Sequence, residues 1–72
     1  MSIQAILSSK AERAGTIMGV LRTPDAAEKY FTMIKILDDS KGFAVGSDTG
    51  QFLMSSASSI LQELEDALDA LA

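Results

Sequence analysis

The last stretch of the chain, residues 59–72, carries the strongest structural pattern in the sequence. Its apolar residues recur at spacings of three and four, which places them on one face of an α-helix. These residues are Ile60, Leu61, Leu64, Ala67, Leu68 and Leu71. Ser59 and Gln62 fit a capping box, in which each side chain accepts a hydrogen bond from a backbone N–H group of the first turn. We therefore predict a C-terminal amphipathic helix that starts near Ser59 and covers the core formed by the rest of the chain.

The opposite face of this predicted helix is acidic. It carries Glu63, Glu65, Asp66 and Asp69. Asp66 and Asp69 lie near the negative end of the helix dipole, where an acid is unfavourable. No base follows them, so we expect Lys10, Arg13 or a partner to offset their charge. The acidic face is predicted either to be solvated or to contact a basic surface of another protein.

The size of the chain limits its stability. Seventy-two residues form a single small domain, 1–72, and a domain of this size buries only about 60% of its unfolded surface. The chain contains neither Cys nor His, which excludes disulfides, Cys-type zinc sites and imidazole chemistry. Association with copies of itself or with a partner is the remaining source of stability, and we predict a homo-oligomer.

Charge and hydropathy exclude two classes of partner. The net charge is −4, and no basic residue follows Lys41. We expect no direct contact with nucleic acid, because cationic surface supplies most of that affinity. We expect no membrane contact either, since the longest nearly apolar run, residues 14–21, is far shorter than the roughly 20 residues that span a bilayer. The N-terminus lacks the pattern of a secretory signal, so we predict a cytoplasmic protein.

Residues 3–21 keep a helical period and predict an N-terminal helix. Gly15 and Gly19 weaken this prediction, but together with Ala11 they form a ridge of small residues at intervals of four. Two interpretations remain open. Either the ridge lets another helix approach closely, for example across a subunit interface, or the helix ends near Gly15 and residues 16–21 are extended.

A second helix is predicted to start after Thr23, which suits the cap position, with Pro24 in the first turn. Its length is ambiguous. If the helix continues to Asp38, its buried stripe includes Tyr30 and Met33. If it stops near Lys29, residues 31–37 form a strand. We favour the short helix, because further turn-bounded apolar runs follow it.

These runs decide the predicted fold class. Apolar segments at 31–37, 43–45 and 51–54 are separated by turn-forming segments at 38–42 and 47–50, a pattern typical of an antiparallel meander. We predict an α+β domain: an N-terminal helix, a short second helix, a three-stranded antiparallel meander or hairpin, and the C-terminal amphipathic helix. The alternative is an all-α three-helix domain with residues 42–50 as a loop.

No catalytic or metal-binding constellation emerges from the sequence. Asp48-Thr49-Gly50 matches the tripeptide of aspartic proteases, but the chain is shorter than half of such an enzyme and a plain turn explains the match. The acids around residues 38–48 lack the alternating ligands of a calcium loop, and the hydroxyls of residues 55–59 have no base to activate them. We therefore expect no enzyme activity, no cofactor and no metal.

Our preferred functional hypothesis is a small, self-associating protein-interaction module of the inhibitor or adaptor type, which binds itself and another protein. The hypothesis depends on the stripe of the terminal helix and on the ridge of small residues. The predicted partner or oligomer interface consists of Ile60, Leu61, Leu64, Leu68, Leu71, Ala11, Gly15 and Gly19.

The alternative hypothesis is a protein that binds or sequesters a small anionic or nucleotide-like ligand. Turn segments supply backbone N–H groups and hydroxyls that suit an anion, and Lys10, Arg13 or Lys41 supplies positive charge. The candidate ligand loop consists of Lys41, Ser47, Asp48 and Thr49.

Overall fold

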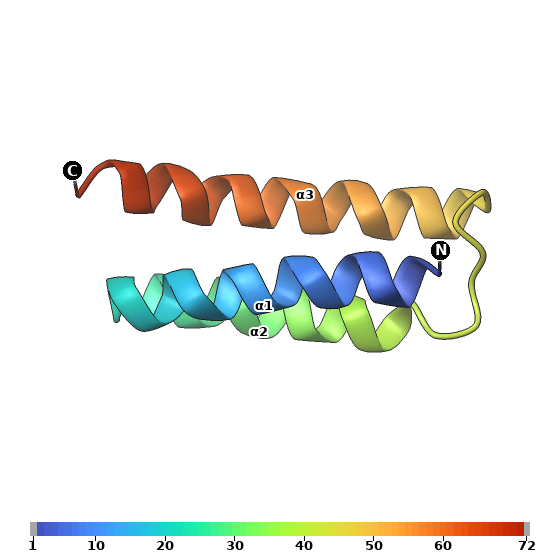
Figure 1. Ribbon diagram of the computed structural model, residues 1–72, viewed down its shortest axis with the longest axis horizontal. Coiled ribbons are helices and arrows are strands. Elements are labelled where there is room, and N and C mark those ends of the chain that lie inside the picture. The colour runs from blue at the N-terminus through green and yellow to red at the C-terminus, as the bar shows by residue number, and fades with distance from the viewer. Residues whose placement is uncertain (1, 72) are drawn as a thin grey trace.

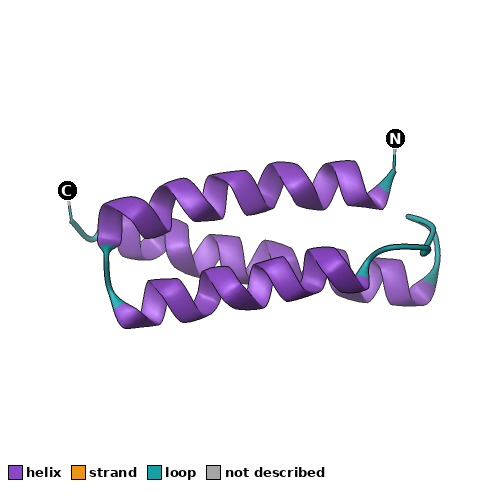
Figure 2. Ribbon diagram, turned by 90° about the horizontal axis from the view of Figure 1, so that it is seen from below, coloured by secondary structure: helices purple, strands orange, loops and turns teal. Residues whose placement is uncertain are grey.

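Three α-helices form the part of the chain that the structure describes. The computed structural model describes residues 2–71, in which α1 spans Ile3–Leu21, α2 spans Pro24–Asp39 and α3 spans Asp48–Asp69. The helices α1 and α3 run in the same direction, and α2 runs antiparallel to both (Figure 1). They form an elongated bundle of 37 × 17 × 16 Å, and each helix packs against the other two (Figure 2). The described part of the chain contains no strand, so the predicted α+β fold is wrong and the all-α three-helix alternative fits.

The N-terminal helix has the bounds that the sequence predicts. Ser2 caps α1, because its Oγ accepts a hydrogen bond from the N–H of Ala5 at 3.1 Å. The helix continues through Gly15 and Gly19, so the alternative in which it ends near Gly15 is wrong. It stops at Arg22, which adopts the left-handed conformation with φ 53° and donates its backbone N–H to the carbonyl of Met18.

The second helix starts as predicted but does not stop at Lys29. The hydroxyl of Thr23 accepts a hydrogen bond from the N–H of Ala26, and Pro24 occupies the first turn. The predicted strand 31–37 is wrong because its apolar side chains follow a helical spacing: Met33 and Ile36, three residues apart, are both buried. The apparent alternation within this segment has no structural consequence.

The third helix begins at Asp48, well before the predicted start at Ser59. Ser47 caps it, since its Oγ accepts from the N–H of Gly50 at 3.0 Å and donates to the carbonyl of Ala44 at 2.7 Å. The segment 47–50 is therefore a helix start rather than a hairpin turn, and the predicted strand 51–54 lies inside α3. Ser59 lies in the middle of the helix; Ala72, the last residue of the predicted stretch, lies outside the described residues.

The core is aliphatic and runs the length of the bundle. Leu7, Ile17, Met33 and Leu64 are its largest fully buried apolar side chains. Small residues let the helices approach each other closely: Ala11 and Ala14 on α1, Ala26 on α2 and Ala57 on α3 are all buried. Among the described residues, no helix combines the length and apolar character needed to cross a membrane.

Candidate functional site

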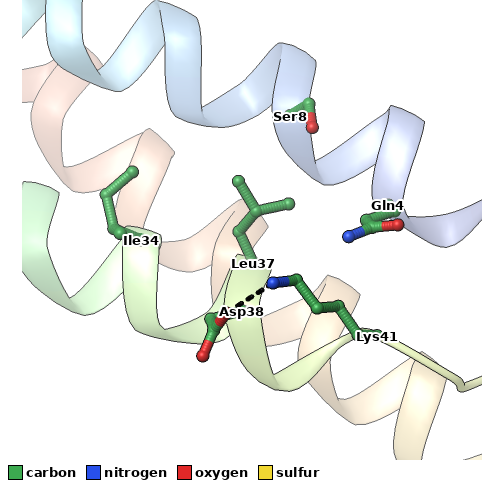
Figure 3. A pocket seen from close by; sticks show the side chains of 6 residues that line it. All are labelled: Gln4, Ser8, Ile34, Leu37, Asp38 and Lys41. Carbon is green, nitrogen blue, oxygen red and sulfur yellow. Dashed lines mark ion pairs between the residues drawn. The ribbon is translucent and has the colours of Figure 1, made fainter.

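A recess of about 180 Å³ lies between the beginning of α1 and the end of α2. We call it the α1–α2 recess. Its walls are formed by Gln4, Ser8, Ile34, Leu37, Asp38 and Lys41 (Figure 3). Because α2 runs antiparallel to α1, residues far apart in the sequence meet here at the same end of the bundle.

Helical spacing places these side chains on facing surfaces. Gln4 and Ser8 are four residues apart and therefore share one face of α1. On α2, Ile34, Leu37 and Asp38 share a face by the same spacing. Both α1 side chains extend toward α2 (Figure 3).

Lys41 lies just beyond the end of α2. Ser40 fixes the chain there: it is buried, its N–H bonds to the carbonyl of Ile36, and its hydroxyl donates to the carbonyl of Leu37 at 2.6 Å. The N–H of Lys41 follows with a bond to the carbonyl of Asp38. The backbone is thus tied back onto α2, which holds the lysine at the edge of the recess.

One ion pair supplies the charge of the recess. The Nζ of Lys41 lies 2.9 Å from Oδ1 of Asp38, and the two side chains are 64% and 70% exposed. The hydrogen bond to Asp38, together with the charge of Asp38, raises the pKa of the Lys41 ammonium. Lys41 is therefore positively charged at neutral pH, and both charged groups remain open to solvent and to a ligand.

The remaining walls are neutral and of two kinds. Gln4 contributes an amide and Ser8 a hydroxyl, and each of these groups both donates and accepts hydrogen bonds. Ile34 and Leu37 form the apolar side. Ligand sites for drug-sized molecules enclose about 300–1,000 Å³, so this recess suits a smaller molecule or a single chemical group.

Only one residue of the predicted ligand loop lines the recess. Lys41 does, whereas the hydroxyl of Ser47 is committed to the cap of α3 and Asp48 and Thr49 form the first turn of that helix. Arg13, also considered as a cation for a ligand, pairs with Glu65 of α3.

Most of the predicted interface packs inside the bundle. Leu64 and Ala11 are buried, and the partly buried side chains of the same stripe pack against the core. A Cβ at Gly15 would lie 3.1 Å from the ring of Tyr30, so this part of the small-residue ridge serves the contact between α1 and α2. Leu71, which is 66% exposed, and Gly19, which has open space beside it, remain on the surface. The partly buried residues of the stripe are Ile60, Leu61 and Leu68.

The acidic face of α3 is mostly exposed, which does not decide between a solvated face and one that contacts a basic partner. Glu63, Asp66 and Asp69 are exposed, and Asp66 accepts a hydrogen bond from the amide of Gln62 at 2.9 Å. Glu65 differs, because it faces α1 and pairs with Arg13. Arg13 is therefore a base that offsets the acids of α3 from within the chain.

Sequence reasoning missed most of the recess and one surface feature. Gln4 and Ser8 are polar residues inside a predicted helix, and only the pairing of α1 with α2 turns them into a wall. The surface feature is aromatic: every Phe of the chain is exposed, Phe31 by 67%, Phe43 by 43% and Phe52 by 70%.

The fold and the recess carry the functional inference without support from relatives. Both the recess and the exposed aromatic side chains are features of this chain's own geometry. Comparisons with protein-family models, with curated proteins and with solved structures found no match.

Proposed function

We propose that the protein is a non-catalytic binding protein that holds a small ligand with an anionic group in the α1–α2 recess. The observation that carries this proposal is the position of Lys41, a charged ammonium at the edge of a recess that also offers an amide, a hydroxyl and an apolar wall. Such a mixture of a few polar groups with apolar side chains is typical of small-molecule sites. The predicted cytoplasmic location stays a prediction.

The size and openness of the recess set the expected ligand and affinity. A volume of about 180 Å³ favours a ligand well below drug size, which argues against a whole nucleotide. Lys41 is largely exposed, and exposed ion pairs contribute at most about 1 kcal/mol. We therefore expect roughly millimolar affinity, sufficient for a metabolite that is abundant.

Titration followed by ¹H–¹⁵N NMR tests the proposal. The labelled protein is titrated with a panel of small carboxylates, inorganic phosphate and amino acids at constant ionic strength. At least one ligand is expected to shift the amide signals of Gln4, Ser8 and Lys41 in a saturable way. The shifts are expected to shrink in Lys41→Gln and to persist in Lys35→Gln, a matched change at an exposed lysine of α2 that does not line the recess.

A panel in which no member produces saturable, Lys41-dependent shifts contradicts the proposal. Shifts that are equal at all lysines contradict it as well, because they indicate general charge screening.

A second candidate function is the self-associating protein-interaction module of the inhibitor or adaptor type. The exposed aromatic side chains favour it, since aromatic residues are enriched in protein interfaces and none of the three Phe residues is used in the core. It ranks second because exposed apolar side chains that are scattered singly are normal, and the stripe first assigned to the interface packs inside the bundle.

Sedimentation velocity over a wide concentration series tests this candidate. Self-association is expected to raise the sedimentation coefficient with concentration, and Phe31→Ser is expected to reduce that rise. Thr32→Ser, a change at the neighbouring exposed position, serves as the control. A sedimentation coefficient that stays that of a monomer at every concentration contradicts self-association.

A further inference from the structure

We infer that the ligand of the α1–α2 recess is a small zwitterion with an apolar side chain, of the class of the free aliphatic and aromatic α-amino acids. This inference rests on the proposed function and specifies its ligand. It follows from the pairing of Lys41 with Asp38 at the edge of the recess and from the apolar surface beside that pair.

The ion pair disfavours a simple anion. Oδ1 of Asp38 lies 2.9 Å from Nζ of Lys41, so an anion that approaches the ammonium also approaches a carboxylate, and like charges repel. A ligand that carries its own ammonium close to its carboxylate removes this conflict. Its carboxylate pairs with Lys41 while its ammonium pairs with Asp38, and the two charges of the protein stay compensated.

The wall formed by α1 accommodates both ends of such a ligand. The amide of Gln4 and the hydroxyl of Ser8 each offer a donor and an acceptor. No hydrogen bond ties either side chain to another group of the described chain, and both extend toward α2 (Figure 3). A donor serves the carboxylate of the ligand, and an acceptor serves its ammonium.

Apolar surface continues from the recess along α2. Leu37 and Ile34 line the recess, and Ile34 is 37% exposed. Phe31 lies three residues before Ile34, hence on the neighbouring turn of the same face, and is 67% exposed. A side chain attached to the zwitterion would cover Leu37 and Ile34, and a longer or aromatic one would reach toward Phe31.

The ion pair and the apolar surface beside it together favour a free amino acid over a peptide. In a peptide the terminal carboxylate and the terminal ammonium lie at opposite ends of the chain. Only one of them therefore reaches a recess of about 180 Å³. A free amino acid brings both charges and one apolar group within the dimensions of the site.

Three related ligands separate the contributions of the ammonium and the carboxylate to binding in an NMR titration of the intact protein. L-Leucine carries both charges, 4-methylpentanoate lacks the ammonium, and leucinamide lacks the carboxylate. L-Leucine is expected to bind about fivefold more tightly than either analogue, the upper range for one exposed ion pair. Equal affinity of L-leucine and 4-methylpentanoate overturns the zwitterion while leaving anion binding intact.

Substitution of Asp38 provides a second, opposite pair of expectations. Asp38→Asn is expected to weaken the binding of L-leucine about fivefold. The same change is expected to strengthen the binding of 4-methylpentanoate, because the carboxylate that repels it is gone. Asp39→Asn is the matched control: it is the adjacent exposed acid, does not line the recess, and is expected to change neither affinity. Since both positions are exposed, thermal melts are expected to show the fold intact.

The outcomes separate this inference from the proposed function. If Asp38→Asn strengthens the binding of both L-leucine and 4-methylpentanoate, the recess binds anions, and a preference for zwitterions is excluded. If none of the three ligands produces Lys41-dependent shifts, and no other member of the wider panel does, both fail.

Discussion

Arg13 of α1 donates two hydrogen bonds to the carboxylate of Glu65 on α3, from Nε to Oε1 at 2.6 Å and from Nη2 to Oε2 at 3.2 Å. A guanidinium and a carboxylate that meet in this bidentate way fix each other's orientation. The pair therefore joins the two parallel helices at a defined register. The hydrogen bond and the charge of Glu65 raise the pKa of the Arg13 guanidinium, and the charge of Asp69, further along α3, adds to this rise.

The first prediction concerns the dependence of stability on pH. The hydrogen bond from Arg13, together with its charge, lowers the pKa of Glu65 below its ordinary value of 4.5. A carboxyl group with a lower pKa in the folded state stabilises the fold above its unfolded pKa, and this stabilisation is lost as the pH falls through the folded pKa. Wild type is therefore expected to lose more stability than Glu65→Gln between about pH 5 and pH 2.

Urea unfolding at a series of pH values measures this difference. Glu12→Gln, at an exposed acid of α1, is the control and is expected to follow the wild-type profile. Parallel profiles for wild type and Glu65→Gln contradict a role for the pair in stability. High salt is expected to shrink the effect, because Arg13 and Glu65 are partly exposed.

The helix starts show how far local sequence determines this fold. The cap at Thr23 and the proline of the first turn, Pro24, are visible in the sequence, and α2 starts there. The start of α3 at Asp48 is not visible, because Ser47 and Gly50 are equally suited to a turn. The structure resolves this ambiguity as a helix start, with the hydroxyl of Ser47 bonded to the N–H of Gly50 and to the carbonyl of Ala44.

Local sequence also identifies only part of the recess. The turn-forming residues around Lys41 in the sequence predict it as a ligand-binding residue. Gln4 and Ser8 lie in a helix whose polar positions look solvated, and they become part of a site only when α2 folds back beside α1. The sequence predicts Asp38 as a turn residue, whereas it lies in the last turn of α2 and pairs with Lys41 three residues on.

The second prediction concerns Gly50. A Cβ at this position would overlap the carbonyl oxygen of Ala44 and lie 2.9 Å from Oγ of Ser47. Gly50→Ala is therefore expected to destabilise the protein by about 1–3 kcal/mol, as overpacking does, despite the better helix propensity of Ala. Gly19→Ala is the matched control, because a Cβ there meets nothing within 4 Å; it is expected to stabilise α1 by up to about 1 kcal/mol. Urea unfolding of both variants measures the contrast, and the same sign for both changes contradicts it.

The third prediction concerns the end of α1. Arg22 has φ 53°, a left-handed conformation that costs about 1–2 kcal/mol for a residue with a Cβ and that Gly adopts freely. Arg22→Gly is expected to stabilise the protein by about 0.5–1 kcal/mol, after the entropy of Gly in the unfolded chain is deducted. Lys35→Gly, inside α2 at an exposed position, is expected to destabilise by about 1 kcal/mol. A loss of stability in Arg22→Gly would show that the hydrogen bond from its Nε to the carbonyl of Gly19 matters more than the backbone conformation.

The last prediction separates core from surface within the terminal helix. Leu64 is 1% exposed and Leu71 is 66% exposed, although both belong to the same apolar stripe. Leu64→Ala is expected to lower the free energy of unfolding by about 2–5 kcal/mol. Such a loss is as large as the stability that the core of so small a domain supplies, about 3–5 kcal/mol, so the variant is expected to be largely unfolded at 25 °C.

Leu71→Ala, by contrast, is expected to change stability by less than about 0.5 kcal/mol, as surface substitutions usually do. The helical circular dichroism of Leu64→Ala at 25 °C, and thermal melts of wild type and Leu71→Ala at low and high protein concentration, provide the measurement. Within a monomeric bundle neither melting temperature depends on concentration, because no association is coupled to unfolding. If Leu71→Ala removes a concentration dependence that wild type shows, Leu71 lies in an interface between copies, and the apolar stripe then serves the core at Leu64 and association at its exposed end.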